Sequence, residues 1–195
     1  MNNCIFTAHC IEPVCDKACP ILVETSYLLE RNGLSFNNAV FNATLDDINC
    51  ARDILHKSAN KLKVYDAKNT IFASDMLTYC AICENWQGNR LHCNVYHLKF
   101  SNHIEAIQRS WSVKTIPESL EYEQIWLSSA KVLIISNIDY VQFKDFQSQT
   151  LLNIIHNRMN NGLSTIIVRP KNHELIGDGT FFIRLKEIFE EAVIK

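Results

Sequence analysis

Glycine is scarce in this sequence. Five glycines occur among 195 residues, and none of them stands in a GxxxxGK[ST] or GxGxxG pattern. Those loops need glycine because only a backbone without Cβ atoms lets several amide N–H groups close around a phosphate. The chain also has no GxSxG elbow and no Ser-His-Asp order. A standard phosphate-binding loop and a standard hydrolase site are therefore both excluded.

Long apolar runs and an excess of one charge are also missing. No run of 18 apolar residues occurs, and the N-terminus lacks the basic and then apolar pattern of a secretory signal. We therefore expect a cytoplasmic protein without a membrane partner. Nineteen basic and 21 acidic residues give a net charge of −2, which excludes a broad basic field but leaves a local patch for single-stranded DNA open.

Cysteine, in contrast, is frequent, with eight residues. Cytosolic thiols stay reduced, so metal ligation or buried thiols are expected rather than disulfides. Four fall within sixteen residues: Cys4, Cys10, Cys15 and Cys19. They predict a structural Zn²⁺ site, with His9 as an alternative ligand, because four short-spaced ligands can converge tetrahedrally. Buried thiols, a redox pair, or an iron–sulfur cluster suggested by Cys19-Pro20 remain alternatives.

A second group of cysteines lies near the middle of the chain. Cys80-x2-Cys83 is followed by Cys93, with His92 beside it and His97 further on. This spacing leaves a second metal site open. The surrounding run MLTYCAIC is apolar on most sides, which favours buried thiols. Residues 95–100 alternate as a strand does, so that the imidazole of His97 need not join Cys93.

The segment from 130 to 170 has the pattern strand, helix, strand. Residues 131–136 and 164–168 are short apolar runs rich in β-branched side chains, as in parallel strands covered on both faces. Gly162 stands where the left-handed C-cap of the intervening helix belongs. Such a unit connects right-handedly in a parallel sheet. The sequence therefore predicts an α/β fold.

Two helices are expected to bury one apolar side each. In the helix at 146–161 the predicted inward residues are Leu151, Leu152, Ile154, Ile155 and Met159. In the helix at 180–194 they are Phe182, Ile183, Leu185, Ile188 and Phe189. Residues 62–65 and 95–100 are predicted strands, and 73–86 and 104–111 predicted helices. We expect a zinc-knuckle and helix appendage at 1–33 and one α/β domain at 34–195.

Four quoted stretches carry a resemblance to a known family. The order VLIISNIDYVQF, NIIHNRMNNG, STIIVRPKNHEL, FFIRLKEIF resembles the second half of the AAA+ ATPase domain of bacterial and phage replicative-helicase loaders. The resemblance implies a three-layer parallel sheet of AAA+/P-loop-like type. It also implies a replicative helicase or another AAA+ replication subunit as the partner, and a phage or mobile element as a natural source. Gram-positive loaders also carry an N-terminal zinc-binding region.

The nucleotide-site positions of that family are altered in this chain. Ser136 and Asn137 stand where the resemblance places the acidic Walker B residues, and Asp139 lies two residues beyond them. In the family the second strand ends in a polar sensor residue, and here Arg169-Pro170 occupies that position. Lys68 and Thr70 match the end of the family's phosphate loop, with an ordinary strand-to-helix loop as the alternative. Arg184 matches an arginine that reads a neighbouring subunit's nucleotide in that family, with a surface arginine or a partner contact as the alternatives. These positions imply a vestigial nucleotide site, so ATP is not an expected cofactor.

Three functions follow from these observations. The first is a non-catalytic, helicase-loader-like adaptor or inhibitor that acts through protein contacts in DNA replication. The second is an ATPase whose phosphate site is built unconventionally from Lys68, Thr70 and Asp139. The third is a zinc-stabilised module that binds single-stranded nucleic acid, against which the near-neutral charge counts.

Overall fold

A parallel sheet with helices on both faces forms the core of the protein. The computed structural model describes residues 28–34, 43–85, 94–113, 116–171 and 174–194. Its strands are β1 (Leu62–Ala67), β2 (Val95–Lys99), β3 (Val132–Ser136) and β4 (Ser164–Pro170). Its helices are α2 (Leu45–Lys57), α3 (Thr70–Asn85), α4 (Phe100–Ser110), α5 (Glu118–Ser129), α6 (Asp145–Asn160) and α7 (Thr180–Ala192). None of these helices combines the length and the apolar character that crossing a bilayer requires.

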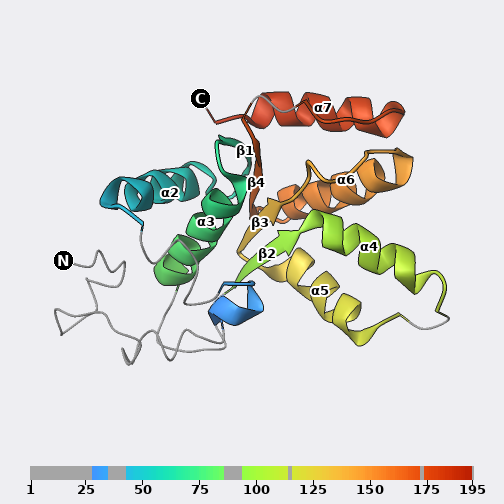
Figure 1. The fold of residues 1–195 in the computed structure, drawn as a ribbon, viewed down its shortest axis with the longest axis horizontal. Helices are drawn as coiled ribbons and strands as arrows, with labels where there is room; N and C mark the ends of the chain where they lie inside the picture. Colours follow the sequence, from blue (N-terminus) through green and yellow to red (C-terminus); the bar gives the residue numbers. More distant parts are fainter. Residues whose placement is uncertain (1–27, 35–42, 86–93, 114–115, 172–173, 195) are drawn as a thin grey trace.

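The strands are all parallel and lie in the order β1-β4-β3-β2. Helices α2 and α3 cover one face of the sheet, and α4, α5, α6 and α7 lie on the other (Figure 1). The central strand β3 is buried along its whole length, as expected for a strand covered on both faces. The predicted α/β fold with a parallel sheet is thus confirmed.

The predicted inward faces of two helices are wrong at one residue each. Leu151, Leu152 and Ile155 of α6 are buried, but Met159 is 50% exposed. In α7 the stripe of Phe182, Leu185 and Phe189 is buried, whereas Ile183 is 61% exposed. Adjacent helical residues are about 100° apart, so a side chain one position off the buried stripe turns to the surface. The residue that continues the buried stripe of α6 is Arg158, not Met159.

Arg158 is fully buried and joins three elements. Its Nε donates a hydrogen bond to Thr165 Oγ1 at 2.8 Å, and its Nη1 donates to the Leu127 carbonyl at 2.9 Å. Its Nη2 donates to the carbonyls of Ala130 at 2.8 Å and Ser164 at 2.6 Å. Burial lowers the pKa of Arg158 to about 10. The guanidinium therefore ties the end of α5 to α6 and to the start of β4.

The outer edge of β2 is closed by side chains from residues 28–34. Asn32 accepts a hydrogen bond from the backbone N–H of His97 at 2.7 Å and donates one to the Leu28 carbonyl at 2.8 Å. Arg31 donates to the Val95 carbonyl at 3.1 Å. An open edge strand offers unpaired backbone groups to other chains. These contacts cover that edge of β2, while the predicted boundary at residue 33 stays a prediction.

Replacing Asn32 with alanine is expected to lower the free energy of unfolding by about 1–3 kcal/mol, because a buried N–H and a buried carbonyl each lose a partner. Urea titration followed by circular dichroism measures the change. Glu30→Ala, at an exposed neighbouring position, is the matched control and should leave the urea midpoint unchanged. Equal midpoints for both variants would show that Asn32 does not hold the edge.

Candidate functional site

The junction between β1 and α3 is short. β1 ends at Ala67 and α3 begins at Thr70, so Lys68 and Asn69 are the two residues between strand and helix. The side-chain Oδ1 of Asn69 accepts a hydrogen bond from the backbone N–H of Phe72 at 3.0 Å. An asparagine at this position supplies the acceptor that the first turn of a helix lacks. The chain itself therefore caps the start of α3.

An ion pair joins β1 and β4 where these strands end. Asp66 and Arg169 are register partners on the two strands. Nε of Arg169 lies 2.5 Å from Oδ1 of Asp66, and its Nη2 lies 3.4 Å from Oδ2. The side chain of Asp66 is 32% exposed and that of Arg169 is 19% exposed. The arginine at the predicted sensor position thus has its charge matched by a carboxylate of the neighbouring strand.

Polar groups also gather where β3 ends. Ser136 Oγ lies 2.8 Å from Nε2 of His97 on β2, and both side chains are buried. Burial, and secondarily Lys99, lower the pKa of His97 to about 4. Asn137 takes the left-handed conformation with φ +59°. Further on, Asp139 has a buried Oδ1 without a hydrogen-bond partner among the described residues.

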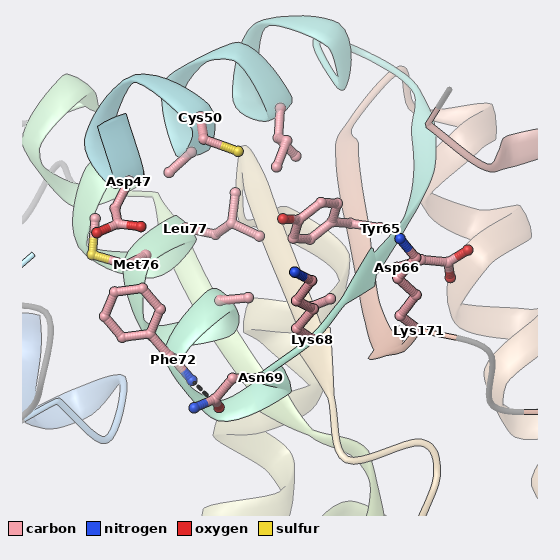
Figure 2. A pocket seen from close by; sticks show the side chains of 14 residues that line it. Asp47, Cys50, Tyr65, Asp66, Lys68, Asn69, Phe72, Met76, Leu77 and Lys171 are labelled. Carbon is pink, nitrogen blue, oxygen red and sulfur yellow. Dashed lines mark hydrogen bonds between the residues drawn. The ribbon is translucent and has the colours of Figure 1, made fainter. Parts of the chain in front are cut away.

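A pocket of about 370 Å³ opens beside the β1–α3 junction. Its walls come from α2, the second half of β1 and the first turns of α3 (Figure 2). The lining side chains are mixed in character: Asp47, Cys50, Tyr65, Asp66, Lys68, Asn69 and Lys171 are polar, and Ala51, Ile54, Ala67, Phe72, Ala73, Met76 and Leu77 are apolar or small. We call it the β1–α3 pocket.

Groups at the α2 side of the β1–α3 pocket are in mutual contact. The side chain of Thr44 caps α2 and bonds Asp47, which lowers the pKa of that carboxyl. Burial, and then the neighbouring Cys50, raise the pKa of Tyr65. Tyr65 is therefore a neutral hydroxyl near pH 7. The pocket offers apolar side chains, hydroxyl and thiol groups, two carboxylates and the side chains of two lysines, Lys68 and Lys171.

The three residues of the predicted vestigial nucleotide site lie at one end of the sheet. Lys68 lines the β1–α3 pocket, Thr70 opens α3, and Asp139 follows β3. Thr70 and Asp139 are not among the residues that line the pocket. Strand β4 lies between β1 and β3, so Lys68 and Asp139 follow strands that are not neighbours. Their shared role stays a prediction.

The structure does not test the predicted Zn²⁺ ligands. Cys4, His9, Cys10, Cys15 and Cys19 lie outside the described residues, so the Zn²⁺ site stays a prediction. The same holds for Cys93 and His92 of the second group.

The described members of the second group do not converge on one metal site. Cys80 and Cys83 are buried within α3, and burial raises the pKa of Cys80 to about 12. Nε2 of His97 faces Ser136 instead. Within the described part of the chain, no three His, Cys, Asp or Glu side chains lie close enough together to hold a metal ion.

Arg184, the predicted partner residue, is exposed on α7.

No protein-family model matches this chain, and no curated protein matches its sequence. Solved structures do share its fold. AMPPCP-bound DnaA from Aquifex aeolicus superposes with a TM-score of 0.56 at 12% identity, over 82% of this chain and 50% of that one. A DNA replication initiation factor gives 0.55 at 12% identity with the same coverage. The chain thus spans about half the length of these two proteins.

The DnaC helicase loader aligns with a TM-score of 0.45 at 16% identity, over 84% of this chain and 95% of that one. The parallel order β1-β4-β3-β2 and the superposition on DnaA together show that this chain shares an α/β fold with part of that protein.

Proposed function

We propose that this chain is a non-catalytic, AAA+-like adaptor or inhibitor that acts through protein contacts in DNA replication. The observation that carries the proposal is the two-residue β1–α3 junction, at which Asn69 caps α3. Phosphoryl transfer depends on positioned phosphates and a held metal ion. Asn69 already accepts a hydrogen bond from one amide of the helix start, that of Phe72, and a junction of two residues is too short to surround a phosphate with further amides.

The charges at this end of the sheet support the same proposal. The guanidinium of Arg169 is neutralised by Asp66, and Ser136 at the end of β3 bonds His97. The two residues at the end of β3, Ser136 and Asn137, are not acidic, and Asp139 lies two residues further along. Mg²⁺ prefers carboxylate oxygens, and these two positions supply none. An AAA+-like surface without phosphate chemistry can still present helices to a partner protein.

The partner in this proposal is a replicative helicase or another AAA+ replication subunit. Size-exclusion chromatography with light scattering, performed with and without ATP and Mg²⁺, tests it directly. The proposal requires a stable complex with the replicative helicase of the same cell, of equal stoichiometry in both conditions. A complex that forms only with ATP would contradict the non-catalytic part, and no complex in either condition would contradict the partner.

The chain itself is expected not to bind nucleotide. Isothermal titration with ATP and Mg²⁺ should give no saturable heat for the wild type, and Lys68→Ala should behave identically. Lys171→Ala, which removes the other lysine of the β1–α3 pocket, is the matched control. Saturable binding that Lys68→Ala abolishes and Lys171→Ala keeps would instead establish an ATPase-like site with an unconventional phosphate contact.

A further inference from the structure

Helix α5 carries apolar side chains on two opposite sides. Leu120 and Leu127 are buried against the rest of the domain. Tyr122 and Ile125 are 58% and 57% exposed. One apolar stripe is enough to pack a surface helix against its core, and a helix that is apolar on both sides is normally covered on both. Packing among the described residues therefore does not account for the outward side of α5.

Two glutamates precede these exposed apolar residues on the same side of the helix. Glu118, Glu121, Tyr122 and Ile125 stand at helical positions i, i+3, i+4 and i+7, so they share one side of the helix. Both glutamates are exposed, and α5 contains neither lysine nor arginine. We call these four residues the α5 outer patch. Ile116, 65% exposed just ahead of the helix, adds apolar surface at its N-terminal end.

The third glutamate of α5 does not belong to the patch. Oε1 of Glu123 accepts a hydrogen bond from the Tyr96 hydroxyl at 3.0 Å, and its Oε2 lies 2.5 Å from Nδ1 of His103. Arg158 holds the last carbonyls of the helix. These bonds fix α5 from the inside. The outer patch therefore sits on a rigid element, which lowers the entropy lost on binding.

The negative charge of the α5 outer patch determines which class of partner it can bind. Nucleic acid is disfavoured because its phosphates would meet the carboxylates of Glu118 and Glu121. A protein segment with apolar side chains flanked by lysine or arginine is complementary to both parts of the patch. Two exposed apolar residues on another helix, Phe181 and Ile183 of α7, lie among charges of both signs, so they favour no partner of one charge.

We infer that the α5 outer patch docks an apolar segment flanked by basic side chains on the protein partner. This inference rests on the proposed function, because the segment belongs to the replicative helicase of that proposal. The two apolar side chains supply the buried contact area, and the two carboxylates orient the basic flanks.

Bio-layer interferometry with immobilised helicase tests the inference. Tyr122→Ser with Ile125→Ser is expected to weaken binding roughly tenfold or more, because the central apolar anchors are lost. Glu118→Lys with Glu121→Lys should weaken it to a similar degree and reverse its dependence on salt. The matched control on α7, Phe181→Ser with Ile183→Ser, should bind as the wild type does. Circular dichroism and thermal melting check that each variant folds.

The outcomes separate the inference from the proposed function. Wild-type affinity in both α5 variants would overturn the inference and leave the adaptor function standing. A wild-type protein that binds no helicase would overturn both. A third arm uses fluorescently labelled oligothymidine. Binding of the oligonucleotide that Tyr122→Ser with Ile125→Ser abolishes would identify the patch as a nucleic-acid surface and overturn the inference.

Discussion

Replacing Arg158 with methionine is expected to destabilise the protein by about 3–5 kcal/mol. The change leaves one hydroxyl and three backbone carbonyls without the donor that they share in the buried interior. Typical domains unfold at a cost of about 5–15 kcal/mol, so the loss takes a large part of the total. Urea unfolding followed by circular dichroism measures it.

Two further substitutions make the Arg158 result specific. Arg158→Lys keeps the charge but not the planar fork of donors, so it should fall between the wild type and the methionine variant. Arg109→Met removes an arginine whose side chain is 82% exposed and bound to Glu105, and should cost about 0.5 kcal/mol or less. A methionine variant at position 158 that is as stable as Arg109→Met would refute the role of Arg158.

Stability is also expected to fall as the pH is lowered from 6.5 toward 4. His97 has an ordinary pKa of 6.5, which burial lowers to about 4 in the folded protein. Between these values the unfolded chain binds a proton that the folded chain does not, so acid favours unfolding. The full effect of this group is about 3 kcal/mol. It is absent above pH 6.5 and complete below pH 4.

The contribution of His97 is isolated by comparing variants. His97→Gln cannot titrate, so its free energy of unfolding should fall less steeply between pH 6.5 and 5, above the range where most carboxylates take up protons. Ser136→Ala removes the hydrogen bond to the imidazole but keeps the burial that dominates the shift. That variant should retain the wild-type slope. Equal slopes for His97→Gln and the wild type would disprove the assignment.

Sequence patterns predicted the central strands well because those patterns are local. The β-branched runs became β3 and β4, and Gly162 takes the left-handed conformation expected after α6, with φ +62°. Helix starts were less accurate. The helix predicted from residue 73 begins at Thr70, and an asparagine just before it was a usable capping signal. The helix predicted from residue 104 begins at Phe100.

Contacts between distant residues could not be predicted. Arg158 bonds carbonyls 28 and 31 residues earlier, and a buried arginine goes against the usual preference of this residue type for the surface. The Asp66–Arg169 pair depends on strand register across 103 residues. The β1–α3 pocket takes its walls from three elements. No local spacing in the sequence carries these relations, because the sheet order creates them.

The order β1-β4-β3-β2 also determines at what point of translation the sheet can be completed. β1 pairs with β4, and its other edge meets Val193 in one bridge. β4 begins about a hundred residues after β1, and Val193 follows later still. During synthesis, α2, β1 and α3 therefore leave the ribosome before the strand that pairs with β1 has been made. Long-range parallel pairing of this kind is also slow to form. A chain released before residue 164 would lack the strand that joins its two halves.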